Sequence, residues 1–121
     1  MDIEQFEAEL RNGLAKLDYI QRLEINQQTE TRFLSKAILE EYYFLKIFFN
    51  SKLVVLNFTL IYLLKDDQNK RLWGIDRDND IGWHTHPVEN PKDHVLIEEK
   101  TVAEIIEIFD QTWQKIKERN E

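Results

Sequence analysis

The chain has 121 residues, enough for one domain with a hydrophobic core, and it carries 16 Lys and Arg against 23 Asp and Glu, a formal net charge of −7. This balance excludes a protein that binds nucleic acid through bulk electrostatics. The absence of cysteine excludes disulfide frameworks and thiolate zinc sites. The acidic start lacks a signal-peptide pattern, and the most apolar run, 53–64, is shorter than the about 20 residues of a spanning helix. We expect one cytoplasmic domain over residues 1–121, with no membrane contact.

A first amphipathic helix is predicted at the start of the chain. Asp2 and Gln5 form a capping-box pattern that marks a helix N-terminus. Apolar residues then recur at helical spacing, at Ile3, Phe6, Leu10, Leu14 and Leu17. Asn12-Gly13 interrupts this pattern, and Gly costs about 1 kcal/mol relative to Ala inside a helix. The helix is therefore expected to end or bend there.

Strand-like runs follow, rich in β-branched and aromatic residues and separated by short polar segments. They are 20–25, 33–39, 42–49, 53–64 and 71–76, with a polar turn at 65–70. Connections of this length join antiparallel neighbours, because a parallel crossover needs about a dozen residues. The nearly continuous apolarity of 53–64 predicts a central strand covered on both faces.

The C-terminal region gives the clearest helix prediction, about Thr101 to Lys117. Thr101 and Glu104 form a capping box, and a helical stripe follows at Val102, Ile105, Ile106, Phe109, Trp113 and Ile116. The predicted fold class is therefore α+β. It has an N-terminal helix, an antiparallel meander sheet of four to five strands, and a C-terminal amphipathic helix packed on the sheet.

The strand runs are rich in aromatic residues, which two functions could explain. These residues are Tyr42, Tyr43, Phe44, Phe48, Phe49, Phe58 and Tyr62, and within the strand runs that hold them, 42–49 and 53–64, Lys46 is the only cation. Core and interface packing accounts for them better than base stacking does. Together with the apolar run they exceed what two modest helices cover. We therefore expect a homodimer or an obligate complex with a partner protein.

All three histidines, His84, His86 and His94, fall within eleven residues, in a stretch that also contains Asp76 and Asp78. On an extended segment the i, i+2 spacing of His84 and His86 points both imidazoles to the same side. This arrangement suits two groups that titrate near neutral pH, and it also suits a pair of metal ligands. Three interpretations stay open: a polar structural loop, a catalytic pair without metal, and a metal site.

Two motif matches in this stretch lack essential parts. The spacing of Asp76, Asp78 and Asp80 opens like a calcium loop, but Ile81 stands where the EF-hand needs Gly. The string 82–87 looks like the His-x-His-Pro core of JAMM-type zinc peptidases, whose later serine and aspartate are absent. An aspartate-rich turn and a polar loop are the preferred interpretations.

The order of the parts resembles the small TumE-like toxin family of prokaryotic toxin–antitoxin pairs. The resemblance covers chiefly residues 53–109. It depends on a strand that ends near an Asp-Asn element, on a His-rich loop and on the capped final helix that begins at 98–104. Asp76, or else Asp78-Asn79, matches the family's first element, and His84 with His86 matches one of its two His clusters.

This resemblance implies an intracellular toxin with ribonuclease-like action that a co-expressed antitoxin silences. Cleaving RNA without metal requires a base near the 2′-hydroxyl and an acid near the leaving oxygen, and His84 and His86 suit both roles. Asp76 or Asp78 would orient or charge one of them. Arg71 and Arg77 would hold the scissile phosphate as bidentate donors.

Two other classes of function remain open from the sequence. One is a non-catalytic interaction module, in which the sheet or the last helix docks a partner protein. The other is a metal-dependent hydrolase that uses His84 and His86 with one of Asp76, Asp78 or His94. No cofactor is expected for the toxin or for the interaction module, whereas the hydrolase would take a divalent metal ion at His84, His86 and His94.

Overall fold

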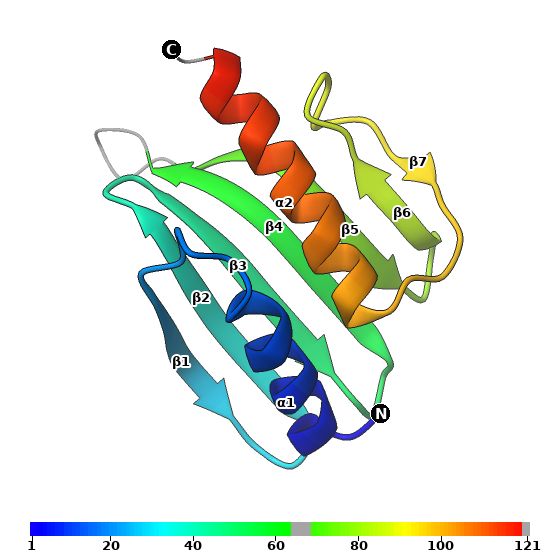
Figure 1. The fold of residues 1–121 in the computed structure, drawn as a ribbon. Helices are drawn as coiled ribbons and strands as arrows, with labels where there is room; N and C mark the ends of the chain where they lie inside the picture. Colours follow the sequence, from blue (N-terminus) through cyan, green and yellow to red (C-terminus); the bar gives the residue numbers. More distant parts are fainter. Residues whose placement is uncertain (64–68, 120–121) are drawn as a thin grey trace.

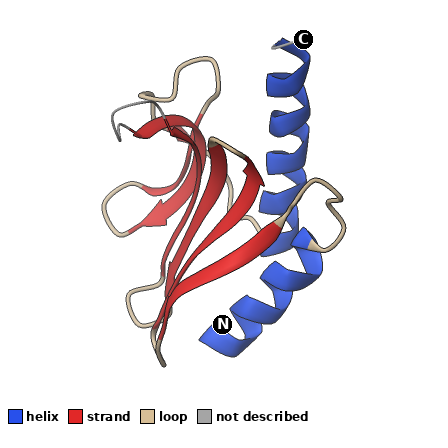
Figure 2. Cartoon of the chain, turned by 90° about the vertical axis from the view of Figure 1, so that its left-hand side faces the viewer, coloured by secondary structure: helices blue, strands red, loops and turns tan. Residues whose placement is uncertain are grey.

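The computed structural model describes residues 1–63 and 69–119 and shows an α+β fold in two layers. Both helices lie on one face of a twisted antiparallel sheet (Figures 1 and 2). The elements are α1 (Ile3–Leu14), β1 (Arg22–Gln28), β2 (Arg32–Glu40), β3 (Tyr43–Asn50), β4 (Val55–Leu63), β5 (Asn69–Asp78), β6 (Gly82–His86), β7 (Val95–Leu96) and α2 (Val102–Arg119). The strands pair in chain order from β1 to β7, so the predicted meander is confirmed.

The sheet has seven strands, and the prediction of four to five is therefore wrong. The two additional strands, β6 and β7, lie in the stretch that the sequence predicts as a polar loop. β6 contains two histidines and one threonine among its five residues, and β7 has only two residues, both exposed. Neither has the apolar alternation that marks a strand, because pairing with β5 rather than burial of an apolar face holds them in the sheet.

Both helices begin at the predicted caps. The side chain of Asp2 accepts a hydrogen bond from the Gln5 backbone N–H at 2.8 Å. At α2 the bonding is reciprocal: Thr101 N–H donates to Glu104 Oε1 at 2.9 Å, and Glu104 N–H donates to Thr101 Oγ1 at 3.1 Å. These bonds satisfy backbone donors that have no partner within the helix.

α1 ends at Leu14, one residue after Gly13, close to the end predicted at Asn12-Gly13. A β-carbon built at Gly13 would overlap Cδ1 of Ile106, a buried residue of α2. The absence of a side chain therefore lets the two helices approach each other closely, and this contact outweighs the propensity cost of glycine in a helix.

The core lies between the helices and one face of the sheet. Phe6 of α1 contacts the rings of Phe33, Phe49 and Phe58, which project from β2, β3 and β4. On α2, Phe109 lies 5.9 Å from the ring centroid of Trp73 in β5. These residues are at most 5% exposed. The apolar residues of both helices are thus buried on this face.

The other face of the sheet carries no helix of the described residues (Figure 2). β4 is the central strand, as predicted, but it is not covered by helices on both faces. Leu56, Phe58 and Leu60 are buried toward the helices, and Asn57 and Thr59 alternate with them on what we call the open face. Of the predicted turn at 65–70, residues 65–68 lie outside the described residues.

The start of β4 also differs from prediction. The run predicted to start at Leu53 enters β4 only at Val55, because Leu53 and Val54 form part of the β3–β4 turn. Val54 has a φ of 54°, in the left-handed region that a β-branched residue rarely adopts.

Among the described residues, no helix is long and apolar enough to cross a membrane.

We predict that Phe109→Ala lowers the free energy of unfolding by about 3–5 kcal/mol, because a fully buried ring is lost and a cavity remains. Chemical denaturation measures this change. Glu107→Ala on the exposed side of α2 is the matched control, expected within about 0.5 kcal/mol of the wild type. A loss below about 1 kcal/mol for Phe109→Ala would contradict docking of α2 through this face.

Candidate functional site

The candidate site lies on the open face, where the sheet register lines up polar residues from three strands. Asn57 of β4 is opposite Asp76 of β5, and Asp76 is opposite His84 of β6. His86, two residues further along β6, points to the same face because side chains alternate along a strand. The prediction that the i, i+2 spacing brings both imidazoles to one side is therefore confirmed.

Asp76 is held by a hydrogen-bond chain that starts in β4. Thr59 Oγ1 donates to Asn57 Oδ1 at 2.7 Å, and Asn57 Nδ2 in turn donates to Asp76 Oδ1. The Asp76 side chain is only 13% exposed. One carboxylate oxygen, Oδ1, is thus bound to the side-chain amide of Asn57, and the other, Oδ2, faces the histidines.

Oδ2 of Asp76 is shared by the two buried imidazoles. Nε2 of His86 lies 3.0 Å from it, and Nε2 of His84 lies 3.4 Å from it. On the far side of each ring, Nδ1 meets a backbone carbonyl: Gly82 O at 2.9 Å from His84, and Pro91 O at 3.0 Å from His86. A carbonyl only accepts, so Nδ1 carries the N–H in both rings. His84 and His86 are 1% and 2% exposed.

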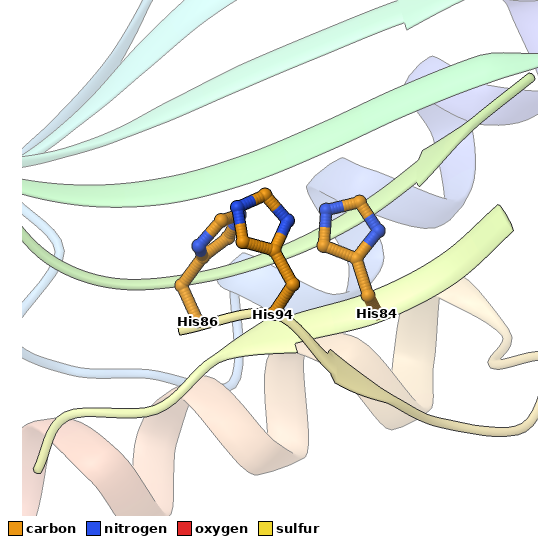
Figure 3. Close-up of side chains that lie close together, drawn as sticks. All are labelled: His84, His86 and His94. Atoms are coloured by element: carbon orange, nitrogen blue, oxygen red, sulfur yellow. The ribbon is translucent and has the colours of Figure 1, made fainter. Parts of the chain in front are cut away.

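His94 joins the two buried histidines although it is eight residues from His86 in sequence. It immediately precedes β7, which pairs with β6 through Leu96 opposite His84. Its ring centroid lies 5.2 Å from that of His84 and 4.7 Å from that of His86. Figure 3 shows the three rings gathered together. One ligand atom from each of the three residues lies within 4.8 Å of the others, and His94 is the exposed member.

Arg71 brings a guanidinium group to the same place. Its Nη1 lies 3.3 Å from Nδ1 and 3.2 Å from Nε2 of His86. An atom almost equidistant from both ring nitrogens at this range lies over the ring face, because an in-plane position would overlap the carbon between them. The contact is therefore of the cation–π kind and leaves the lone pair of Nε2 free.

A groove of about 600 Å³ crosses the open face over β2 to β5. Its lining includes the cations Arg32, Lys46 and Arg71, and none of its described lining residues is acidic. Phe48 is also in the lining and is half-buried, with the guanidinium of Arg32 at 5.4 Å from its ring centroid. Phe48 therefore does not pack in the core, which is one of the two roles, core and interface packing, expected for the aromatic residues. The guanidinium beside its ring belongs to Arg32, which is distant in the chain.

Two other predicted site residues have their hydrogen bonds outside the cluster. Asp78 is the last residue of β5, and its Oδ1 accepts from the backbone N–H of Ile81 at 2.6 Å and of Asp80 at 3.0 Å, although its carboxylate also interacts electrostatically with His84. Arg77 donates to the Val54 carbonyl and, at 3.5 Å, to Asn79 Oδ1. In β5 it alternates with Asp76, so it belongs to the face opposite the cluster.

The sequence reading does not identify Asn57, Thr59, Lys46 and Arg32 as site residues. Asn57 and Thr59 are polar residues two apart within the most apolar run, and this pattern is the signal that marks a polar stripe on one face of a strand. Lys46 and Arg32 have no such signal, because only the register of β2, β3 and β4 brings them to the groove.

We predict that Asp78→Asn lowers the melting temperature at neutral pH and that this difference disappears in acid. The hydrogen bond from the Ile81 N–H lowers the pKa of Asp78 below its ordinary value. A carboxyl with a lowered folded-state pKa stabilises the protein above its unfolded-state pKa, and this stabilisation is lost as the pH falls through the folded-state pKa. Thermal unfolding of both proteins across the acid range measures it.

The control for this experiment is Asp80→Asn in the same turn, an exposed residue whose side chain makes no hydrogen bond within the described part of the chain. It is expected to leave the melting temperature unchanged at every pH. A difference between Asp78→Asn and the wild type that persists or grows in acid would contradict the charge-dependent bond.

Comparison with known proteins gives no relative from which to transfer a function. No family model, no curated protein and no solved structure matches the chain. The TumE-like resemblance accordingly stays a prediction, and the site's own geometry carries the argument for function.

Proposed function

We propose that the protein is a hydrolase that cleaves the phosphodiester backbone of single-stranded RNA, with ribonuclease-like action at Asp76, His84 and His86. The observation that carries this proposal is the groove of the open face, which has three cations and no described acid in its lining and leads through Arg71 to the histidine cluster. A phosphate on Arg71 would lie beside the groups that can move protons.

The charge of the groove supports a polyanionic substrate despite the acidic chain. Arg32, Lys46 and Arg71 come from three different strands. Lys46 is opposite Lys36 in the β2–β3 register, which adds a fourth cation on the same face. Successive phosphates of a single strand would meet successive cations, and the half-buried ring of Phe48 offers a surface for a base.

The reaction needs two proton transfers near one phosphate. In ribonuclease-like cleavage the 2′-oxygen forms a bond to phosphorus and the bond from phosphorus to O5′ breaks, while one group accepts the 2′-hydroxyl proton and another protonates O5′. The cluster offers two imidazoles and a carboxylate within hydrogen-bonding reach of one another. Arg71 would stabilise the charge that builds on the phosphate oxygens.

A cellular role as the toxin of a toxin–antitoxin pair belongs to the same proposal, because it is what the TumE-like resemblance implies. A partner protein would then cover part of the surface. Leu53, Val54, Ile81 and Leu96 are exposed apolar residues at turns and at the edge strand β7. They are the described side chains best suited to such a contact.

We predict that Arg71→Ala and Lys46→Ala each weaken binding of a labelled oligouridylate, with an affinity that falls as salt rises. Fluorescence anisotropy measures binding, and a gel assay measures cleavage of the same RNA. Each lost phosphate contact should also reduce the salt slope by about 1. Arg71→Ala should in addition lower the cleavage rate at saturating RNA, because Arg71 contacts His86.

The matched control is Arg22→Ala, which removes an exposed arginine that pairs with Glu24 on β1 outside the groove. It should leave binding and cleavage unchanged. In cells, expression should arrest growth, and His86→Ala should abolish the arrest. A folded wild-type protein that neither binds nor cleaves RNA would overturn the proposal in favour of a non-catalytic interaction module.

We also predict a homodimer when the chain is purified without a partner protein. Multi-angle light scattering at micromolar concentration should report twice the chain mass, and Leu53→Asp or Leu96→Asp should shift it toward the monomer, because a charge at an apolar contact is costly. The exposed Ile25 lies in β1, away from these turns and from β7, so Ile25→Gln is the control. A monomeric wild type would contradict self-association.

A further inference from the structure

Three acceptor atoms converge in the histidine cluster with no donor between them. Both Nδ1 atoms donate to backbone carbonyls, so Nε2 of His84 and Nε2 of His86 carry lone pairs in the neutral rings. Both face Oδ2 of Asp76, at 3.4 and 3.0 Å, and a carboxylate oxygen also only accepts. Lone pairs at these distances in a buried site repel one another unless a cation lies among them.

Among the described residues, the cation in contact with this cluster is Arg71, and it contacts His86 and not His84 or Asp76. Arg71 lies over the face of His86, where its N–H groups do not reach the Nε2 lone pair in the ring plane. A proton on one ring would serve one of the two contacts between Nε2 and Oδ2, and protons on both rings would gather two imidazolium charges and the Arg71 guanidinium around a single carboxylate. One metal ion, by contrast, would engage all three acceptors at once, and His94, which has a ligand atom within 4.8 Å of one on each of the other two histidines, would supply a further ligand.

We propose that His84, His86, His94 and Asp76 form a binding site for one divalent transition-metal ion of the zinc class. In a tetrahedral site with bonds of about 2.0–2.1 Å, ligand atoms lie roughly 3.3 Å apart. The two distances from Asp76 Oδ2 already have this spacing. His94, which is exposed and just follows the 87–93 loop, is the ligand best able to move onto the ion.

The surroundings of the four ligands favour this class of ion. Imidazole nitrogens suit zinc and its transition-metal neighbours, whereas magnesium and calcium prefer oxygen ligands. Backbone carbonyls hold the Nδ1–H of His84 and of His86, which is the usual support for histidine ligands bound through Nε2. Asn57 holds the other oxygen of Asp76 and so fixes Oδ2 toward the ion.

Only the chemical role of the metal ion rests on the proposed function; the binding of the ion does not. A divalent ion held by these four ligands would polarise a phosphoryl oxygen that joins it as a fifth ligand, an expansion that zinc sites allow. With the ion present, Nε2 of both imidazoles would be bound to it, so the ion and not the imidazoles would act on the phosphate. Metal binding itself is a property of the four side chains and is measured without RNA.

The test begins with the full chain freed of metal by a chelator and then titrated with Zn²⁺ in a calorimeter. The expected result is saturation at one ion per chain, with a rise in melting temperature. Co²⁺ in place of Zn²⁺ should give the visible absorption of a four-coordinate site. A folded wild-type chain that takes up neither ion overturns the proposal.

Variants show where the ion binds. His94→Ala and Asp76→Asn should weaken Zn²⁺ binding by about 10- to 100-fold or more, whereas Asp93→Asn, an exposed neighbour of His94, should leave it unchanged. His94 is exposed, so its replacement tests the site without the risk of unfolding that replacing buried His84 carries. Equal affinity in the wild type, His94→Ala and Asp76→Asn overturns the site.

The outcome for the ion and the outcome for RNA separate the two proposals. RNA cleavage that persists in the chelated protein, together with no Zn²⁺ uptake, overturns the metal site and leaves the ribonuclease proposal in place. Stoichiometric Zn²⁺ uptake at the four residues without RNA binding confirms the metal site and overturns the ribonuclease proposal. Cleavage that requires Zn²⁺ and is lost in His94→Ala supports both.

Discussion

The register of β4, β5 and β6 is the constraint on which the site depends. Backbone pairing sets Asn57 opposite Asp76 and Asp76 opposite His84, so three polar residues form one row across the sheet. If one of these strands slipped by one residue, its polar side chain in this row would turn to the helix side of the sheet. Phe58 and Ile75 fill the core on that side. The apolar residues that alternate with the row therefore fix the position of the polar ones.

The one-sided cover of the sheet gives these polar residues their environment. Close contact between α1 and α2 at Gly13 and Ile106 places both helices on a single face of the sheet, and the apolar residues of the helices cover that face. The open face is left to side chains that neighbouring strands bury only in part. His84 and His86 are an exception, because His94 and the segment through Pro91 pack around them. Burial of the pair thus depends on a loop, not on a helix.

The parts of the fold that local physics determines could be predicted from the sequence. Capping boxes and apolar periodicity identify both helices, and short polar connections identify the antiparallel order. The strand number could not be predicted, because β6 and β7 are stabilised by pairing at the edge of an existing sheet and carry no apolar alternation. Local pattern thus gives no measure of how far a sheet extends once its core strands exist.

The histidine pair could be predicted, because the spacing of two residues has only one consequence on a strand. It could not be predicted that Arg71 and Arg77 lie on opposite faces of the sheet. Regular alternation would place Arg71 on the same side as Trp73 and Arg77, but the β4–β5 ladder shifts between Leu60 and Ile61, so Trp73 is opposite Leu60 and Arg71 is opposite Ile61. This bulge turns Arg71 to the open face and leaves Arg77 on the other.

The net negative charge of the chain is compatible with a basic groove, because electrostatic interactions between exposed charges are screened with distance. A net charge of −7 describes the whole chain, whereas the field at a bound phosphate is dominated by charges within a Debye length, about 8 Å at physiological salt. Around the groove those charges are the cations Arg32, Lys46 and Arg71 and the carboxylate of Asp76, which is hydrogen-bonded to the groove residue Asn57. Exposed acids on the helices lie across the thickness of the sheet and are largely screened by salt at that distance. An acidic chain can therefore hold a short anionic segment on one face while it repels nucleic acid elsewhere, which favours contact at a few phosphates over binding along a long polymer.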